Sequence, residues 1–176
     1  MNNGLDQLRT SLQGYKEEDL RQAIELLFFA YRDFTGEADT VLANFGFGRA
    51  HHRAIYFIAR NPGISVSDLL SILKITKQSL SRVLTQLIKE DYVRPQTDTE
   101  DRRRRLLELS PKGEDLERQL TARQCSRIIG AFEAAGVDSF SGFRSILRGM
   151  IDPGDQDRVD QSSKYFAKGD KRRLAG

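Results

Sequence analysis

The stretch DRRRRLLELSPKG, residues 101–113, passes from a charged turn through a strand to the start of a helix. Residues 105–109 have the pattern of a short β-strand, and so does an earlier run, residues 92–96. The segment between them is charged and rich in Asp and Thr, which is typical of a hairpin with a long tip. Ser110-Pro111 then supplies an N-cap serine and a proline at the first helical position. We therefore predict a β-hairpin followed directly by a helix.

Three more helices are predicted ahead of this hairpin, over residues 49–60, 66–73 and 77–90. The first ends at the Asn61-Pro62-Gly63 turn. The second begins at a capping box in which the Ser65 hydroxyl and the Asp68 carboxylate cover free N–H groups. The third begins after Thr76, which is a good N-cap residue. The short link between the second and third helices predicts a helix-turn-helix.

The third of these helices has one apolar side, made by Leu80, Val83, Leu84, Leu87 and Ile88. Polar groups on its first turns lie off that stripe. A helix, a short helix, a polar-fronted helix and a charged hairpin form, in this order, a winged helix-turn-helix, whose third element enters the major groove of DNA. Residues 60–113 hold eleven Lys and Arg against seven Asp and Glu, whereas the rest of the chain holds 17 against 18. The basic charge is thus concentrated where DNA would lie.

The same region resembles the MarR family of bacterial transcriptional regulators. DRRRRLLELSPKG is similar to the wing signature of that family: Asp-x-Arg, a strand, then Leu-[Thr/Ser]-x-x-Gly. GISVSDLLSILKITKQSLSRVLTQLIKEDYVRP, residues 63–95, resembles its helix-turn-helix, with Asp91-Tyr92-Val93 where Gly-Tyr/Leu-Val is common. The resemblance runs from about residue 49 to 113 and, more loosely, into the flanking helices. It implies a mainly α fold with a small β-hairpin wing: a winged helix-turn-helix plus a helical dimerisation region (α+β).

The resemblance further implies a homodimer bound to a pseudo-palindromic operator in double-stranded DNA. Carried over by position, the recognition helix would present Lys77, Gln78, Ser79, Ser81, Arg82 and Thr85 to the DNA. The wing would contribute Asp101, Arg102, Arg103, Arg104 and Arg105. Arg103 would enter the minor groove, with Asp101 orienting its guanidinium group.

Some of these residues have an alternative role. The alternative for the arginine run is a solvated loop that does not contact DNA. The alternative for Arg105 is an ion pair with Asp98, Glu100 or a partner helix. Ser79 would serve only the first turn of its helix. Lys74 and Lys77 are phosphate contacts or plain surface.

Residues 17–45 carry apolar side chains at every third or fourth position, which indicates one long amphipathic helix. A small domain seldom needs a stripe of this length, so we expect part of it to pack on a partner chain. The predicted organisation is a flexible N-terminal arm (1–16), an N-terminal dimerisation helix (17–47), the winged helix-turn-helix (48–113), C-terminal dimerisation helices (114–151) and a mobile basic tail (152–176).

Composition limits the other function classes. A net charge of +3, 30% charged residues and a mean hydropathy of −0.51 are typical of a soluble protein. The start of the chain lacks an apolar signal segment, and the apolar run at residues 24–31 is too short to span a bilayer, so we expect a cytoplasmic protein without a membrane partner. No HExxH, Gly-rich phosphate loop or nucleophile elbow is present, and adjacent His51 and His52 point about 100° apart on a helix. We expect no enzyme, no cofactor and no metal site.

Regulators of the family that this chain resembles often hold small aromatic acids between the dimer helices and the winged unit. Phe28, Tyr31, Arg32, His52 and Tyr56 would supply the aromatic walls and positive group of such an effector pocket. A ligand that prefers the DNA-incompetent arrangement of the two winged units would release the operator. Core packing is the alternative for each of these residues.

Cys125 is the single cysteine, so no intrachain disulfide is available. It falls in the predicted dimerisation helix, where Arg123 and Arg127, two positions away, point elsewhere. We expect a buried structural thiol, with redox sensing as the alternative. A winged helix that binds an acidic protein in place of DNA is the other alternative function.

Overall fold

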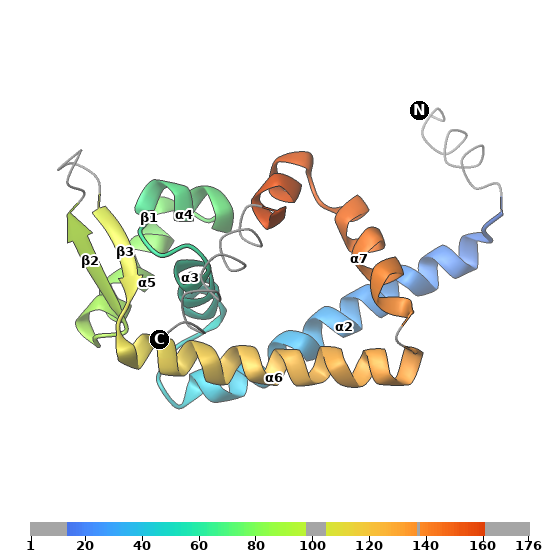
Figure 1. The fold of residues 1–176 in the computed structure, drawn as a ribbon, viewed down its shortest axis with the longest axis horizontal. Coiled ribbons are helices and arrows are strands. Elements are labelled where there is room, and N and C mark those ends of the chain that lie inside the picture. Colours follow the sequence, from blue (N-terminus) through green and yellow to red (C-terminus); the bar gives the residue numbers. More distant parts are fainter. Residues whose placement is uncertain (1–13, 98–104, 137, 161–176) are drawn as a thin grey trace, which may run out of the picture.

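The computed structural model describes residues 14–97, 105–136 and 138–160. Figure 1 shows long helices along one side and a small sheet at one end. In chain order the elements are α2 (Glu17–Ala43), α3 (Arg49–Arg60), β1 (Ile64–Ser65), α4 (Val66–Leu73), α5 (Lys77–Lys89), β2 (Val93–Thr97), β3 (Arg105–Leu109), α6 (Pro111–Ala135) and α7 (Ser139–Met150). The mainly helical fold with a hairpin wing is confirmed.

The wing belongs to a three-stranded antiparallel sheet in the order β1-β3-β2. Val93 lies opposite Leu109 and Thr97 opposite Arg105, so the hairpin has the predicted position. Strand β1 was not predicted, because two residues, Ile64 and Ser65, are too few for a strand pattern. Its pairing of Ile64 with Leu107 attaches the hairpin to the start of α4.

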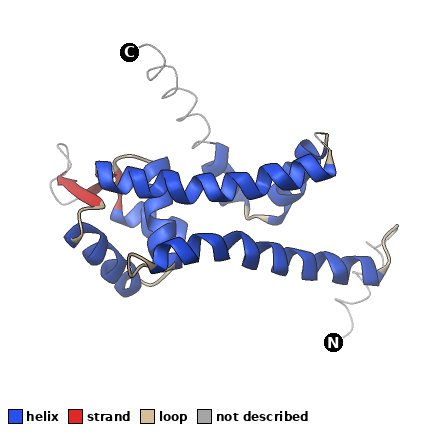
Figure 2. Cartoon of the chain, turned by 90° about the horizontal axis from the view of Figure 1, so that it is seen from below, coloured by secondary structure: helices blue, strands red, loops and turns tan. Residues whose placement is uncertain are grey.

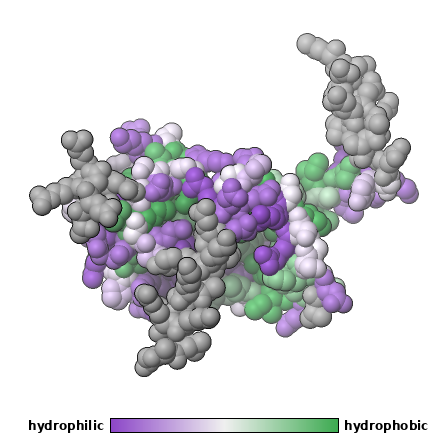
Figure 3. Space-filling view, turned by 45° about the horizontal axis from the view of Figure 1, so that its top comes forward, coloured by the Kyte–Doolittle hydropathy of each residue, from purple (hydrophilic) through white to green (hydrophobic). Residues whose placement is uncertain are grey.

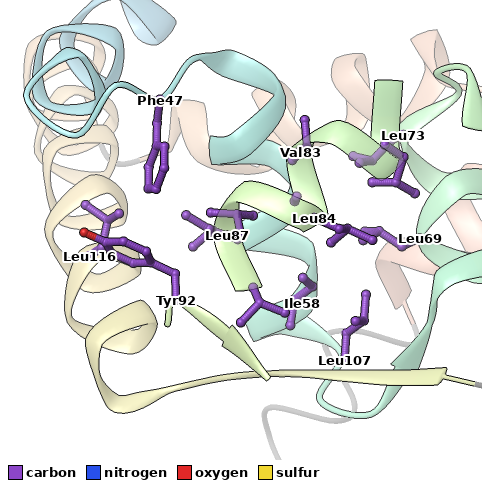
Figure 4. Close-up of a cluster of buried hydrophobic side chains, with 14 of the residues drawn as sticks. Phe47, Ile58, Leu69, Leu73, Val83, Leu84, Leu87, Tyr92, Leu107 and Leu116 are labelled. Atoms are coloured by element: carbon purple, nitrogen blue, oxygen red, sulfur yellow. The ribbon is translucent and has the colours of Figure 1, made fainter. Parts of the chain in front are cut away.

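The core of the winged unit lies between α3, α4, α5 and the sheet (Figure 4). Each of these elements contributes fully buried side chains: Ala54, Ile55, Ile58, Leu69, Leu80, Leu87, Val93 and Leu107 are at most 1% exposed. At about 1.5–3 kcal/mol for each large buried aliphatic side chain, this core supplies most of the driving force for folding the unit. It holds α5 rigidly by its apolar side.

Serine and threonine caps start the helices where the sequence places them. Ser65 Oγ accepts a hydrogen bond from the Asp68 N–H, Thr76 Oγ1 from the Ser79 N–H, and Ser110 Oγ from the Gly113 N–H. Each satisfies one of the free donors in a first helical turn. These three contacts confirm the predicted starts of α4, α5 and α6.

The junction between the wing and α6 is close-packed. Ser110 is fully buried, and its hydroxyl donates to the Asp91 carbonyl while its N–H donates to the Tyr92 carbonyl. A Cβ atom at Gly113 would overlap the same Tyr92 carbonyl oxygen. The Ser-x-x-Gly part of the motif therefore serves the join of β2 to α6, and glycine is needed there for close approach.

The long helices α2 and α6 run in opposite directions along the molecule (Figure 1), and Figure 2 shows the long helices from below. Only the last part of α2 reaches the core, through fully buried Ala38 and Leu42, near Leu116 and Leu120 of α6. Helix α2 ends at Ala43, two residues before the end of the apolar pattern, because Gly46 turns the chain with a φ of +65°.

The C-terminal part of the chain differs from the prediction. Residues 153–160 form a further short helix, which lies beside α4 (Figure 1). We predicted a mobile tail from residue 152. This helix was not predicted, and Lys74 pairs with Asp152 and Asp155 of the segment across a large sequence separation. Most of the predicted basic tail, residues 161–176, and the arm to residue 13 lie outside the described residues. Among the helices that the structure describes, none is long and apolar enough to cross a membrane.

Candidate nucleic-acid interface

Helix α5 presents a polar surface on the side away from the core. The six residues predicted to face DNA are all exposed: Lys77, Gln78, Ser79, Ser81, Arg82 and Thr85. Leu80, Val83, Leu84 and Leu87 are buried on the opposite side. The structure thus brings the predicted recognition residues together on one outward face that starts at the N-terminus of the helix.

The predicted recognition residues differ in the hydrogen bonds that their side chains make within the chain. Thr76 Oγ1 lies 2.9 Å from Ser79 Oγ and donates to it, so Ser79 helps to hold the helix start, as the alternative role for this residue anticipated. Within the residues that the structure describes, Gln78 and Arg82 have no hydrogen-bond partner for their side chains. Gln78 and Arg82 therefore carry donors that are available to base edges or phosphates.

The wing is described only up to its tip. Asp101, Arg102, Arg103 and Arg104 lie outside the described residues, and Arg105 is exposed at the end of β3 opposite Thr97. At the other end of the hairpin the Arg94 guanidinium binds the Asp91 carboxylate in a bidentate pair, at 3.0 and 3.1 Å. That arginine lowers the pKa of the Asp91 carboxyl.

Asp91 has a left-handed backbone, with a φ of +56°. Glycine adopts this conformation at no steric cost, and aspartate is one of the few other residues that tolerate it. This explains how Asp91 occupies the position at which the MarR pattern commonly has glycine. The sequence pattern located the turn but did not reveal its conformation.

A hydrogen-bonded bridge ties α3 to α5. His51 Nδ1 accepts the Gly48 N–H at 3.1 Å, so in the neutral ring the proton is on Nε2, which donates to Gln86 Oε1 at 3.0 Å. The ring also stacks on Phe47, with centroids 4.9 Å apart. His51 is thus a structural residue that orients the recognition helix. Among the described residues, no group of three or more His, Cys, Asp or Glu side chains is placed to hold a metal ion.

The predicted effector residues have unequal surroundings. Phe28 and Tyr31 are 62% and 55% exposed on α2, whereas His52 is 8% exposed and Tyr56 is half-buried, with its ring edge-on to a neighbouring phenylalanine. The Arg32 guanidinium donates to the adjacent Asp33 carboxylate at 2.8 Å. Burial lowers the pKa of His52, with a smaller contribution from the nearby Arg53, while Asp39 acts in the opposite direction. His52 is therefore mostly uncharged near neutral pH.

A cavity of about 800 Å³ lies elsewhere. Its walls come from the end of α3 and the following turn, from α4 and from the C-terminal helical segment. None of the five predicted effector residues lines it.

Cys125 is exposed on α6, so the prediction of a buried thiol was wrong for the single chain. Its apolar neighbours along α6, including Ile129, also face outward. Arg127, two residues on, forms an ion pair with Glu37 of α2. Burial of this thiol could not be judged from helix periodicity, because the stripe of α6 is shared between the core and an open side.

Helix α5 is the second helix of a helix-turn-helix, presents an outward polar face and is followed by an antiparallel hairpin. This arrangement defines a winged helix-turn-helix DNA-binding protein. Comparison with known proteins identifies the family. Residues 45–104 match the model of the MarR family. The chain is 48% identical over 137 residues to the HTH-type transcriptional regulator PetP of Rhodobacter capsulatus, covering 78% of this chain and 82% of the relative. The chain belongs to the MarR family of transcriptional regulators.

Solved structures agree with this fold. The crystal structure of Streptococcus pneumoniae FabT in complex with DNA has a TM-score of 0.67 at 16% identity, covering 74% of this chain and 94% of that one. The crystal structure of NadR in complex with 4-hydroxyphenylacetate has a TM-score of 0.57 at 25% identity, covering 76% of this chain and 90% of that one. The relatives found are regulators of transcription rather than enzymes.

Proposed function

We propose that this regulator acts as a homodimer in the cytoplasm, where the two winged units bind the half-sites of a pseudo-palindromic operator. The observation that carries the proposal is the outward polar face of α5 on a unit whose core is complete, beside long helices whose apolar residues are uncovered. FabT, a protein with this fold, was solved with DNA. In this proposal the winged unit contacts DNA and the long helices form the dimer.

The recognition surface consists of Lys77, Gln78, Ser79, Ser81, Arg82 and Thr85, with Asp101, Arg102, Arg103, Arg104 and Arg105 in the wing. Gln78 and Arg82 are the principal base-reading candidates, because a Gln amide pairs with adenine and an Arg guanidinium with guanine. The wing arginines would follow the phosphate backbone or the adjoining minor groove, where Arg103 enters with Asp101 beside it.

The dimer interface is supplied by apolar side chains that a single chain leaves in contact with water. Ile24 and Phe28 of α2 are 69% and 62% exposed, and Ile146 of α7 is 66% exposed. Figure 3 shows hydrophobic surface at the end of the molecule away from the wing, and further hydrophobic surface nearer the wing. Large contiguous apolar patches on a protein surface mark interaction sites, so these helices are the candidates for the interface.

The proposed DNA contact is tested with duplexes selected from a random pool by the purified protein. A dimer with about 6–10 phosphate contacts should give a log–log salt slope near −0.9 for each contact. Arg82→Ala should weaken binding by roughly tenfold or more. Lys89→Ala, at the C-terminal end of the same helix, is the matched control and should change affinity little. Selection of no duplex at low salt would contradict the proposal.

We also propose that a small aromatic or phenolic acid releases the operator. NadR was solved with 4-hydroxyphenylacetate. The aromatic side chains of α2 and α3, with Arg32 and His52 between them in the chain, are groups that suit a ligand with an aromatic ring and a carboxylate. Titration with 4-hydroxyphenylacetate should displace the selected duplex from the wild-type protein and much less from Tyr56→Ala. Release that is equal for both proteins would contradict a role for this residue, and no release by aromatic acids would contradict the proposed effector class.

A further inference from the structure

The C-terminal segment, residues 152–160, is attached to the helix-turn-helix at three points. Lys74 Nζ donates to Asp155 Oδ2 at 2.9 Å and to Asp152 Oδ2 at 3.2 Å. Arg158 donates to the Ser71 hydroxyl at 2.8 Å. The two carboxylates raise the pKa of the Lys74 ammonium group, Asp155 more than Asp152, so this lysine stays charged. Segments far apart in the sequence are thereby joined by charge.

Lys74 occupies the turn of the helix-turn-helix. It is the C-cap of α4, with a left-handed φ of 49°, and Thr76, the N-cap of α5, follows two residues later. Glycine is the usual residue at such a C-cap, because other side chains are strained there. Since two residues span at most about 7 Å, the backbone of Lys74 lies close to the N-terminus of the recognition helix.

The segment that holds Lys74 is acidic. Residues 152–160 contain four Asp and one Arg. A carboxylate pair around an ammonium group provides the same kind of negative oxygen ligands as a DNA phosphate. DNA that approaches the start of α5 would meet both a lysine that is already neutralised and a local surplus of negative charge.

The attachment is one that DNA can displace. The ion-paired side chains are partly in water: Lys74 is 60% and Asp152 79% exposed. Asp155, Arg158 and Val159 line one wall of the 800 Å³ cavity opposite α3 and α4, so the segment is not closely packed on the winged unit. Exposed ion pairs are weak and are screened by salt.

We propose that the C-terminal segment is an autoinhibitory acidic strap: Asp152 and Asp155 occupy Lys74 in place of a DNA phosphate and thereby lower the affinity of the protein for DNA. The inference rests on the proposed use of α5 as the DNA-reading helix. Displacement of the strap frees Lys74 for the backbone beside the recognition helix. The strap therefore raises the protein concentration at which an operator becomes occupied.

The test compares Asp152→Asn/Asp155→Asn with the wild-type protein on a selected duplex of about 30 base pairs, long enough for two half-sites. The variant should bind roughly tenfold or more tightly at 50 mM salt, with a smaller gain at 200 mM, and its log–log salt slope should steepen by about 0.9 for each freed lysine. Arg158→Ser, which removes the hydrogen bond to Ser71 and so weakens the attachment without removing an acid, should shift affinity in the same direction by a smaller amount.

Two further variants distinguish the strap from a general effect of lowering the negative charge of the chain. Asp6→Asn/Asp170→Asn removes the same charge from the N-terminal arm and the C-terminal tail, outside the proposed DNA and dimer interfaces, and should leave affinity unchanged. Lys74→Gln, added to Asp152→Asn/Asp155→Asn, should abolish the gain.

Binding by Asp152→Asn/Asp155→Asn that is equal to or weaker than wild-type binding would overturn the strap, as would a gain that survives Lys74→Gln. The proposed function would stand in each case, because it is tested on the wild-type protein, by duplex selection and by the number of chains on the duplex.

Discussion

The winged unit and the long helices use similar side chains in opposite ways. In α5, Leu80 and Leu87 are at most 1% exposed, and Ser81, Arg82 and Thr85 between them face water. In the first half of α2, Ile24 and Phe28 are more than 60% exposed although the apolar pattern is just as regular. One region buries its apolar side chains within the chain, and the other leaves them exposed, where we propose that a second chain covers them.

The difference shows what each region is able to do alone. The core of the winged unit is closed within the chain, with the end of α2 and the start of α6 contributing Ala38, Leu42, Leu116 and Leu120, and it positions α5 and the hairpin. The first half of α2 and helix α7 would gain burial on the proposed association, and each large apolar side chain that becomes buried contributes about 1.5–3 kcal/mol. Assembly and DNA contact are therefore separable by substitution, and the following predictions test that separation.

The largest effect is expected at the join between the two regions. Gly113→Ala places a methyl group on the Tyr92 carbonyl oxygen, so it should lower the free energy of unfolding by about 4 kcal/mol or more, by overpacking and loss of the Ser110 hydrogen bonds. Gly130→Ala, in open space on the same helix, should be neutral or stabilising by up to about 1 kcal/mol. Denaturant unfolding measures both; similar stability of the two variants would contradict the close-packed join.

The next effect is on assembly. Ile24→Glu with Phe28→Glu should weaken the dimer by about 3 kcal/mol or more, because each chain then loses two apolar contacts and buries charge. The winged unit should stay folded, so the far-ultraviolet circular dichroism of the protein should show its helices retained. Arg21→Gln, one turn away and paired with Glu17 in solvent, is the control. Sedimentation equilibrium that shows unchanged dimers for the double variant would remove α2 from the interface.

The smallest effect is a pH dependence that arises inside the winged unit. The pKa of His52 is lowered from about 6.5 by burial in the folded state, so the unfolded state binds the proton more readily. The free energy of unfolding should therefore fall as the pH falls below 6.5, and His52→Leu should lose less stability between pH 7 and pH 5. Parallel pH profiles for the two proteins would show that His52 carries no such contribution.

Local chemistry made much of the fold predictable. The caps at Ser65, Thr76 and Ser110 act within four residues of their own position, so the sequence pattern was sufficient to place the starts of three helices. The outward face of α5 followed from the spacing of its leucines. Features that depend on distant partners were not predictable in this way.

Three such features show the physical limit. Strand β1 exists because Ile64 pairs with Leu107, and the helical turns at residues 153–160 exist beside Lys74 of a remote turn. The exposure of Cys125 depends on which side of α6 faces the chain's own core. Helical periodicity identifies an apolar side but not the molecule that covers it, which is also why the stripe of α2 indicated a partner without showing the contact.

The most direct test of the division between a closed winged unit and an open dimerisation surface is native mass spectrometry of the protein with its selected duplex. We predict two chains for each duplex, with the two half-sites about one helical turn apart, and loss of the complex for Ile24→Glu with Phe28→Glu although each winged unit remains folded. A single chain on the duplex, or full binding by that double variant as a monomer, would contradict the account.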